Sequence, residues 1–195
     1  MGKIFCLMGK SSSGKDTIFK ELNNDKELNL KSIILYTTRP KRLNERNGNE
    51  YFFIDEDKLN QYENENKIIE LRKYNTVSGI WSYATIDEGQ IDLNRNNYIT
   101  IVTLEAYNSL KDYFGKDNVF PIYINVEDGV RLERALNRER EQIQPNYNEL
   151  CRRFIADNVD FSNENLKRSG INREYQNYDF KRCIKEIKNE LINNT

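Results

Sequence analysis

Residues 9–16 read Gly-Lys-Ser-Ser-Ser-Gly-Lys-Asp, a spacing that could bind the phosphate groups of a nucleotide. Two glycines placed as in GxxxxGK let a loop curl so that successive backbone N–H groups point at anionic oxygens. A lysine adds a cation, and the N-terminus of a following helix adds a favourable dipole. The residues expected around the polyphosphate are Gly9, Ser11, Ser12, Ser13, Gly14, Lys15, Asp16 and Thr17.

Asp16 stands where this motif usually places a Ser or Thr whose hydroxyl meets Mg²⁺. A carboxylate beside a triphosphate is repelled unless a divalent ion lies between them, so Asp16 is a candidate Mg²⁺ ligand, directly or through water. The alternative is a carboxylate in the first turn of a helix, where the helix dipole favours it. The sequence leaves both interpretations open.

A second group of residues could hold another phosphate. Arg39 and Arg42 lie three positions apart around Pro40, and Tyr51 supplies a phenol that can reach the same anion. A proline-stiffened pair of guanidinium groups suits a dianionic phosphate. Taken alone, the segment is more typical of a solvated basic loop, but a phosphate loop upstream makes it a candidate second phosphate site.

The absence of histidine limits the chemistry further. It removes histidine-based triads, histidine metal sites and an imidazole general base. Transfer of a phosphoryl group between phosphates needs no such base, because the accepting phosphate is already largely ionised near neutral pH, with a second pKa of about 6. Lys, Arg and Mg²⁺ are the groups that this reaction requires.

Strands and helices that could position these residues are evident in the pattern of apolar residues. Residues 3–8 form a continuous apolar run typical of a buried strand, and residues 15–23 have the pattern of a helix. Asp55 is expected to cap a helix, and Gly79 to lie in a turn between two strands. Further strands are expected at 32–36, 51–54, 67–74, 81–86, 98–103 and 119–124, and further helices at 56–64, 105–114, 128–142, 146–159 and 179–193.

Helices alternate with buried strands at both ends of the chain, which predicts an α/β fold with a mainly parallel sheet flanked by helices. Residues 37–95 interrupt that alternation with more polar strands, so we expect a core of residues 1–36 and 96–195 and an inserted lobe of residues 37–95. A chain of 195 residues is long enough for one well-filled core.

Composition excludes several classes of protein. A net charge of −1 argues against a general nucleic-acid or membrane surface, and no apolar run is long enough to span a bilayer. Cys6, Cys151 and Cys183 are odd in number and widely spaced, which argues against a disulfide framework or a zinc knuckle. With no secretion signal in residues 1–8, we expect a cytoplasmic protein.

The phosphate loop and the segment Thr-Thr-Arg-Pro-x-Arg-x-x-Glu-x-x-Gly-x-x-Tyr-x-Phe, residues 37–53, together resemble the guanylate kinase family. The likeness is closest at 9–17, 37–53 and 70–85. It implies a P-loop NTPase-type core, an NMP-binding lobe at about 37–95 and an arginine-bearing lid at about 137–153. The implied reaction is phosphoryl transfer from ATP, with Mg²⁺, to a nucleoside monophosphate, GMP being favoured.

The resemblance also implies roles for individual residues. Lys15 would hold the donor phosphates, and Glu70 would accept hydrogen bonds from guanine N1–H and the 2-amino group, for which a carboxylate offers two adjacent acceptors. The acceptor site would comprise Arg39, Arg42, Tyr51, Glu70, Tyr83 and Thr85. The lid would carry Arg134, Arg138, Arg140 and Arg153, and the catalytic group would be Lys15, Arg42, Arg138 and Arg153.

Alternatives remain for these residues. Glu70 could be an exposed strand residue, and Tyr83 could serve packing. Arg131, Arg134 and Arg138 share one helix face, but the interleaved glutamates Glu133, Glu139 and Glu141 are also typical of a salt-bridged surface helix.

Three departures from the family pattern bear on base recognition and metal binding. Leu35 stands where the family tends to have a serine that touches guanine, Val102–Tyr107 replaces an Asp-x-Asp-x-x-Gly segment, and residues 75–81 form an extra insert. Other acceptors therefore stay open, either another nucleotide or a sugar phosphate such as ribose 1,5-bisphosphate. A non-catalytic guanylate-kinase-like module is a third reading, although such modules typically lose the phosphate-loop lysine that is present here as Lys15.

Overall fold

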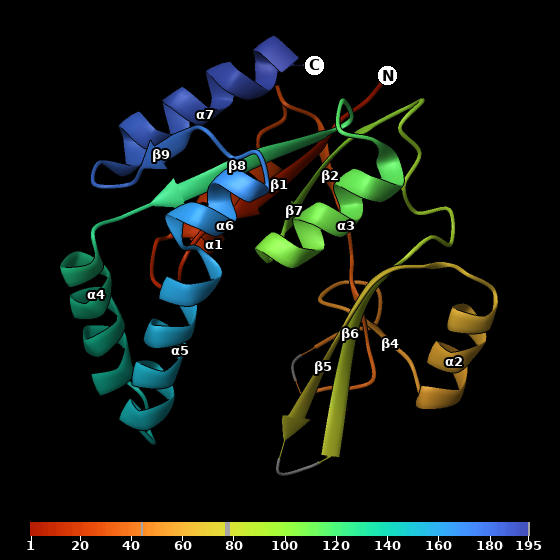
Figure 1. Ribbon diagram of the computed structural model, residues 1–195, viewed down its shortest axis with the longest axis horizontal. Helices are drawn as coiled ribbons and strands as arrows, with labels where there is room; N and C mark the ends of the chain where they lie inside the picture. Colours follow the sequence, from red (N-terminus) through yellow and green to blue (C-terminus); the bar gives the residue numbers. More distant parts are fainter. Residues whose placement is uncertain (44, 77–78, 195) are drawn as a thin grey trace.

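The core of the molecule is a five-stranded parallel sheet, described here from a computed structural model that covers residues 1–43, 45–76 and 79–194. The strands lie in the order β2-β7-β1-β8-β9, and every neighbouring pair is parallel. Their bounds are β1 Ile4–Met8, β2 Leu30–Ser32, β7 Asn97–Ile101, β8 Val119–Asn125 and β9 Glu174–Gln176. The predicted α/β fold with a parallel sheet is confirmed (Figure 1).

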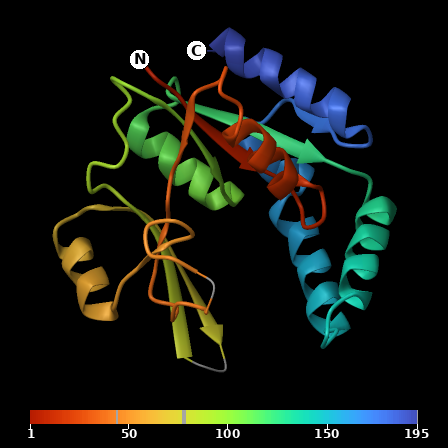
Figure 2. The same ribbon diagram turned by 180° about the vertical axis from the view of Figure 1, so that it is seen from behind.

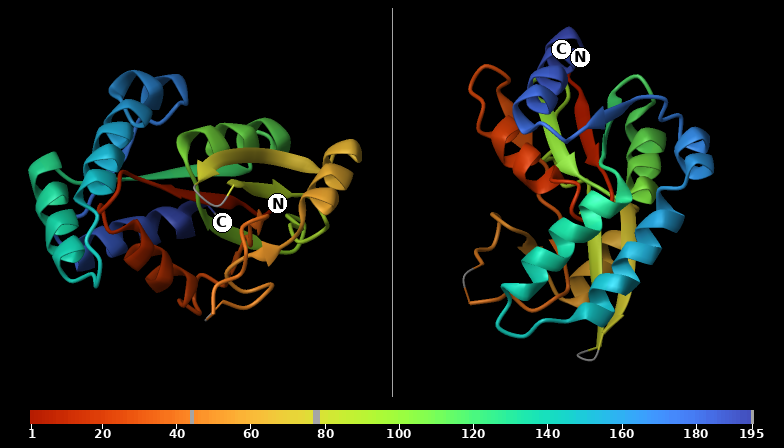
Figure 3. Two further views of the ribbon diagram at one scale, coloured as in Figure 1. Left: turned by 90° about the horizontal axis from the view of Figure 1, so that it is seen from below. Right: turned by 90° about the vertical axis from the view of Figure 1, so that its left-hand side faces the viewer.

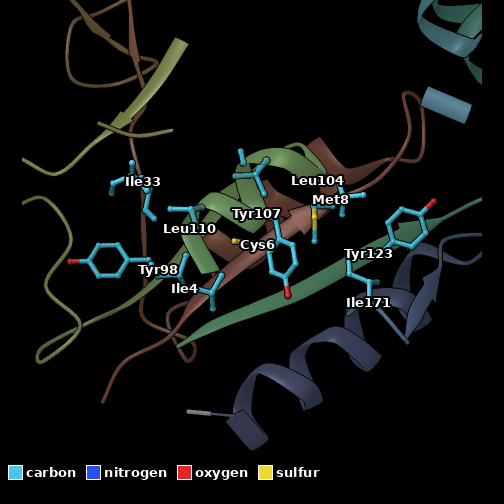
Figure 4. Close-up of a cluster of buried hydrophobic side chains, with 14 of the residues drawn as sticks. Ile4, Cys6, Met8, Ile33, Tyr98, Leu104, Tyr107, Leu110, Tyr123 and Ile171 are labelled. Atoms are coloured by element: carbon cyan, nitrogen blue, oxygen red, sulfur yellow. The ribbon is translucent and has the colours of Figure 1, made fainter. Parts of the chain in front are cut away.

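Helices cover both faces of this sheet. Alternate residues of β1 point to opposite faces, as expected of a strand buried on both sides. Ile4, Cys6 and Met8 pack with side chains of α3 (Leu104–Phe114) and α6 (Asn163–Arg168), as Figure 4 shows for α3. Phe5 and Leu7 pack with α1 (Lys15–Asn23) and α7 (Phe180–Asn194). This three-layer core fixes the end of β1, from which the phosphate loop begins.

A second, four-stranded sheet lies beside the core, in the order β4-β3-β6-β5. Its strands are β3 Tyr36–Thr37, β4 Phe52–Phe53, β5 Ile68–Thr76 and β6 Gly79–Ile86. The helix α2 (Glu56–Asn64) packs on it through Leu59 and Tyr62. Asp55 caps α2 by accepting a hydrogen bond of 2.7 Å from the Lys58 N–H, as the sequence predicts.

Two connecting segments, residues 33–35 and 87–96, join the second sheet to the core. The side-chain amide of Gln90 makes a reciprocal pair of hydrogen bonds with the backbone of Ile34. The Ile34 N–H donates to Gln90 Oε1 at 3.1 Å, and Gln90 Nε2 donates to the Ile34 carbonyl at 3.0 Å. The two segments are therefore tied to one another where they pass between the sheets (Figure 2).

A pair of helices, α4 (Asp128–Arg140) and α5 (Tyr147–Asp160), projects from the core on the same side as the second sheet but at the opposite end of the molecule (Figures 1 and 3). Both chain termini lie at the far end of the core (Figure 1). None of the described helices combines the length and the apolar character needed to cross a membrane.

The strand predicted at residues 32–36 is wrong, because this apolar run is divided between the two sheets. β2 ends at Ser32 and β3 begins at Tyr36. Between them Ile33 packs into the core, and the Ile34 backbone pairs with Gln90 instead of a strand. A run of apolar residues indicates that its residues are buried, but it does not show that they form a strand. Here the run contains a core residue, Ile33, and part of a connecting segment, Ile34.

Smaller differences occur elsewhere along the chain. The strand predicted at 98–103 ends at Ile101, because Thr103 caps α3 by accepting a hydrogen bond of 3.2 Å from the Ala106 N–H. The helix predicted at 128–142 ends at Arg140. The sequence analysis missed α6 and β9, which span 6 and 3 residues and are too short to show a period.

Candidate active site

The loop between β1 and α1 has the backbone that its glycines predict. Gly14 has a φ of 87°, and a Cβ there would lie 2.4 Å from Asn177 Nδ2. At Gly9 a Cβ would lie 2.7 Å from the Ile124 carbonyl oxygen. Both positions therefore need glycine, one for its left-handed conformation and both for close approach. The loop ends at the N-terminus of α1, where the helix dipole favours an anion.

Lys15 and Asp16 are neighbours at the start of α1, with Lys15 Nζ 3.9 Å from Asp16 Oδ2. The Asp16 side chain is 75% exposed, and Lys15 and Gly9 line a cleft that also reaches the second sheet. The buried hydroxyls of Ser12 and Ser13 have no hydrogen-bond partner within the part of the chain that the structure describes. The loop therefore holds polar groups that its own fold leaves unsatisfied.

Asn177 holds this loop from the other end of the chain, and the sequence analysis missed it. It follows β9, and its side-chain Nδ2 donates a hydrogen bond of 2.8 Å to the Ser13 carbonyl. Its own N–H donates to the Asn125 carbonyl at 3.1 Å, at the end of β8. The residue is buried. A lone asparagine 164 positions away from the loop gives no pattern that could have identified it.

We expect Asn177→Ala to lower the free energy of unfolding by about 1–2 kcal/mol, because the buried Ser13 carbonyl loses its donor. ATP affinity is expected to fall by about tenfold, since the loop loses the contact that fixes its curl. Urea unfolding and calorimetry with Mg²⁺–ATP measure the two effects. The matched control is Asn172→Ala, in the exposed loop before β9; an equal effect of both variants would contradict this role.

Arg39 is buried and paired within its own segment. Its guanidinium donates to both carboxylate oxygens of Glu45, at 3.0 and 2.7 Å, and lies over the rings of Tyr51 and Phe53 at 5.5 and 5.6 Å. Arg42 is exposed, and its backbone N–H donates to Glu45 Oε2 at 2.8 Å. Glu45 thus orders the segment that carries both arginines.

Aromatic side chains line the side of the second sheet that faces the core. Tyr83 lies between Tyr51 and Tyr74, edge-on to each, with ring centroids 5.7 Å apart in both pairs. Burial raises the pKa of Tyr51, so its phenol stays protonated and can donate a hydrogen bond.

Glu70 and Thr85 are buried on β5 and β6, and the half-buried Arg72 pairs with Glu70. Arg72 Nε and NH2 donate to the two carboxylate oxygens of Glu70 at 3.0 and 3.1 Å, and the Thr85 hydroxyl donates to Glu70 Oε1 at 3.4 Å. Burial raises the pKa of Glu70, and the charge and hydrogen bonds of Arg72 oppose that rise. The predicted insert 75–81, beyond this group, includes residues 77–78, which lie outside the described residues.

One cleft of about 600 Å³ brings the two candidate sites together. Its lining includes Lys15 from the phosphate loop and Tyr51 and Tyr83 from the second sheet. The end of α5 forms a further wall with Asp157 and Asp160, and Phe161 follows directly after the helix. The cleft is also lined by Leu35, Arg72, Tyr74 and Trp81. Arg39, Arg42, Glu70 and Thr85 are not among the described residues that line it.

The arginines of α4 divide into two groups. Arg131, 1% exposed, joins α4 to α5 and the loop: it donates to Asp128 at 2.7 Å and to the Ser11 carbonyl at 3.0 Å, and lies 3.6 Å from Asp157. Arg134 and Arg138 instead line a cavity of about 350 Å³ beside the phosphate loop. This cavity is completed by Ser12, Gly14, Asp16 and Thr17.

The other two predicted lid arginines, Arg153 and Arg140, differ in their position relative to the loop. Arg153 shares a cavity of about 220 Å³ with Arg138 and Ser11, and its Nε donates to Glu149 at 2.7 Å. Arg140, at the end of α4, is exposed and donates to Asn137 at 3.4 Å. Arg138 and Arg153 are therefore close to the loop, whereas Arg140 is not among the described residues around either cavity.

The pairing of Glu149 with two arginines on α5 predicts that part of the stability depends on pH. Hydrogen bonds from Arg152 and Arg153 lower the pKa of Glu149 to about 2. A lowered pKa means that this stabilisation is complete above the ordinary value near 4.5 and is lost as the pH falls through the folded value near 2. As the pH falls from 4.5 to about 2, we expect the free energy of unfolding to decrease less for Glu149→Gln than for the parent chain, as measured by urea unfolding. Parallel plots of this free energy against pH for the two proteins would contradict the pairing.

Metal binding by the chain alone is not supported. No cluster of three acidic, cysteine or histidine side chains suited to a metal ion occurs among residues 1–43, 45–76 and 79–194. Asp16, exposed and beside the loop, is a single carboxylate. A single carboxylate fits Mg²⁺ held mainly by nucleotide phosphates and water, which is the usual way that proteins bind Mg²⁺ at such sites.

Comparisons with known proteins agree with this geometry. The family model described as guanylate kinase matches residues 1–164. The chain is 28% identical over 187 residues to the guanylate kinase of Malacoplasma penetrans, covering 92% of this chain and 83% of that protein. It is 34% identical over 148 residues to that of Mycoplasma mobile, covering 72% and 71%.

A solved structure agrees at the level of the fold. The crystal structure of guanylate kinase from Anaplasma phagocytophilum matches with a TM-score of 0.67, covering 98% of this chain and 85% of that chain at 17% identity. The matched family model includes the phosphate loop, the second sheet and both projecting helices, since it extends from residue 1 to residue 164. This chain belongs to the guanylate kinase family.

Proposed function

We propose that this chain transfers the γ-phosphoryl group of ATP to GMP, yielding ADP and GDP. An oxygen of the GMP phosphate attacks the γ-phosphorus, and the bond from that phosphorus to the β–γ bridging oxygen breaks. The observation that carries the proposal is the shared cleft, which has Lys15 in one wall and Tyr51 and Tyr83 in another. Family membership supplies the acceptor and the donor.

The donor phosphates are assigned to the loop of residues 9–14 and to Lys15, Asp16 and Thr17. Backbone N–H groups and the Lys15 ammonium would neutralise the β- and γ-phosphates. Asp16 would hold Mg²⁺, directly or through water, and the ion would supply further positive charge there. Arg134 and Arg138, beside the loop, would stabilise the charge that spreads over the transferred group. Arg153 and Arg140 would approach when the lid, residues 137–153, closes and excludes water.

The acceptor phosphate is assigned to Tyr51, Arg39 and Arg42. The Tyr51 phenol can donate, and the Arg39 guanidinium lies over its ring at 5.5 Å. Arg42 is exposed on the adjoining segment, so its long side chain can reach the phosphate without breaking an existing pair of the described residues. The base is assigned to the part of the cleft that Leu35, Arg72 and Tyr83 line, next to Glu70.

A release assay for ADP with a panel of acceptors tests this proposal. The panel contains GMP, the other common nucleoside monophosphates and ribose 1,5-bisphosphate, each with Mg²⁺–ATP. We expect GMP to give the highest kcat/KM, and turnover of only a pyrimidine nucleotide or of the sugar phosphate would overturn the assignment. No turnover with any acceptor, together with no ATP binding in calorimetry, would indicate a binding module instead. Because ATP and GMP are cytoplasmic metabolites, we assign the activity to the cytoplasm.

A further inference from the structure

A cavity of about 600 Å³ lies at the edge of the core sheet, and none of its described lining residues belongs to the cleft of the candidate active site. It opens where β9 is too short to cover β8. β9 pairs only with Tyr123–Asn125, so Val119–Ile122 have no strand beside them on that edge among the described residues. α3 borders the cavity on one face of the sheet through Tyr107, and α7 borders it on the other through Glu190.

The open edge of β8 does not suit an added peptide strand. The Asn177 N–H donates to the Asn125 carbonyl at 3.1 Å, on the side of β8 away from β1. Because backbone groups alternate along a strand, Val119 and Pro121 also face this side. Pro121 has no N–H, so an added strand would find a single donor, that of Val119, along the uncovered stretch. A small molecule is therefore the occupant that this edge favours.

The charged groups around the cavity favour an anion. Lys111, Lys116 and Arg173 line it, against one described carboxylate, Glu190, which is paired with Arg173. Lys111 Nζ donates to the Ser169 carbonyl at 2.9 Å and to one side-chain amide at 3.1 Å, which leaves the third of its N–H donors available. The exposed Lys116 side chain has no ion pair or hydrogen bond with any described residue. The lining therefore holds more positive charge than its own carboxylate neutralises.

Tyr107 supplies a buried donor for which the described chain provides no acceptor. The residue is 3% exposed and lines the cavity, and Figure 4 shows its ring extending from α3 toward β8. Its hydroxyl makes no hydrogen bond with any described residue. Burial raises the pKa of Tyr107 to about 12, so the phenol stays protonated at neutral pH and can donate. Lys111 Nζ lies 5.0 Å from the centre of the same ring, so a cation and a free donor are neighbours.

We propose that this cavity binds a small aromatic acid, whose carboxylate accepts hydrogen bonds from Tyr107 and Lys111 and is attracted by Lys116. The rest of the lining is largely apolar and includes Val119, Phe120, Pro121 and Ile171. Small-molecule sites of about 300–1,000 Å³ typically combine such walls with a few polar groups, and a flat ring packs well against an aromatic side chain. The site is additional to the proposed reaction and does not depend on it.

The first test is calorimetry on the unaltered protein with 2-naphthoate and its neutral analogue 2-naphthylmethanol. We expect one site with a Kd of about 100 µM for the acid, as its size allows, and binding about tenfold weaker for the alcohol, which brings no charge. Saturating Mg²⁺–ADP and GMP should change the Kd of the acid by less than about twofold, because the two sites share no described lining residue. Equal affinity for acid and alcohol, displacement by the nucleotides, or no binding of the acid at about 2 mM would overturn the proposal.

The second test reverses the charge at the cavity with Lys116→Glu. We expect the Kd of 2-naphthoate to rise about tenfold, and the cation 2-naphthylmethylammonium to bind more tightly than the acid. The matched control is Lys26→Glu, an exposed position in the turn between α1 and β2, which makes the same change in net charge away from the cavity. This control should leave the Kd within about twofold of the parent value. An equal effect of both variants would overturn the assignment to this cavity.

Tyr107→Phe separates a binding role from a structural one. Its hydroxyl has no described partner in the chain, so its removal should leave the midpoint of urea unfolding unchanged or slightly higher. The Kd of 2-naphthoate should rise about tenfold, because the carboxylate loses a donor in a buried place. ADP release should stay within about twofold of the parent value, since Tyr107 does not line the cleft. A lower midpoint with an unchanged Kd would overturn the role of this hydroxyl as a ligand donor.

Discussion

Lys15→Met is expected to lower kcat for ADP release by about 1,000-fold, because removing one cation or donor aimed at the transition state typically costs a factor of 10²–10³ or more. Lys15 lies in the cleft wall formed by the phosphate loop, whereas the proposed acceptor residues lie on the second sheet. GMP affinity in calorimetry should therefore stay within about threefold of the parent value. The two measurements separate loss of transition-state stabilisation from loss of substrate binding.

Lys20→Met is the matched control for this variant. Lys20 lies on the same helix, α1, but is exposed on its surface, so its loss removes an equal charge without touching the loop. We expect kcat within about twofold of the parent value for this control. An equal decrease in both variants, or a large loss of GMP affinity with Lys15→Met, would contradict the assignment of Lys15 to the donor site.

Arg131→Met is expected to lower the free energy of unfolding by about 3 kcal/mol, because it breaks a buried ion pair by removing one partner only. Asp157, 16% exposed, would lose the cation 3.6 Å away, and the Ser11 carbonyl would lose a donor at 3.0 Å. The Arg131 guanidinium also lies 4.7 Å from the centre of the Phe154 ring, a contact that holds α5 to α4. Urea unfolding with a constant m-value measures the effect.

Arg182→Met tests whether this loss is specific to the buried pair. Arg182 lies on α7 and donates to Glu186 at 2.9 Å, but its side chain is 80% exposed. Exposed pairs of this kind contribute about 1 kcal/mol or less, so the control should be close to the parent chain. If Arg131→Met lowers the free energy of unfolding by less than about 1 kcal/mol, the assignment is contradicted, because water would then already solvate the charge of Asp157.

Much of the fold could be predicted because local signals and tertiary structure agree. The run Ile4–Met8 is apolar throughout and is buried on both faces, and Asp55 caps α2 as its position predicts. The strand predicted at 32–36 is wrong, since an apolar sequence does not show whether its residues pair with a neighbouring strand. β9 could not be predicted because three residues carry no period.

Some residues of the candidate site could likewise be predicted from the sequence, and others could not. Gly9, Gly14 and Lys15 could be identified because a curled loop imposes a fixed spacing on nearby residues. Asn177 could not, since it acts through the Ser13 carbonyl, which only the folded chain brings close to it. Arg131 was placed on a face with Arg134 and Arg138, but periodicity alone does not distinguish a buried structural arginine from one that faces a ligand.

The side-chain amide of Gln90 links the two segments that connect the second sheet to the core. Its two hydrogen bonds with Ile34 join the outgoing and returning chains, so bending one chain without the other would break them. A rotation of the small sheet that keeps these two hydrogen bonds moves both connecting segments together. A backbone break in either crossing would leave the small sheet attached, held by the intact crossing.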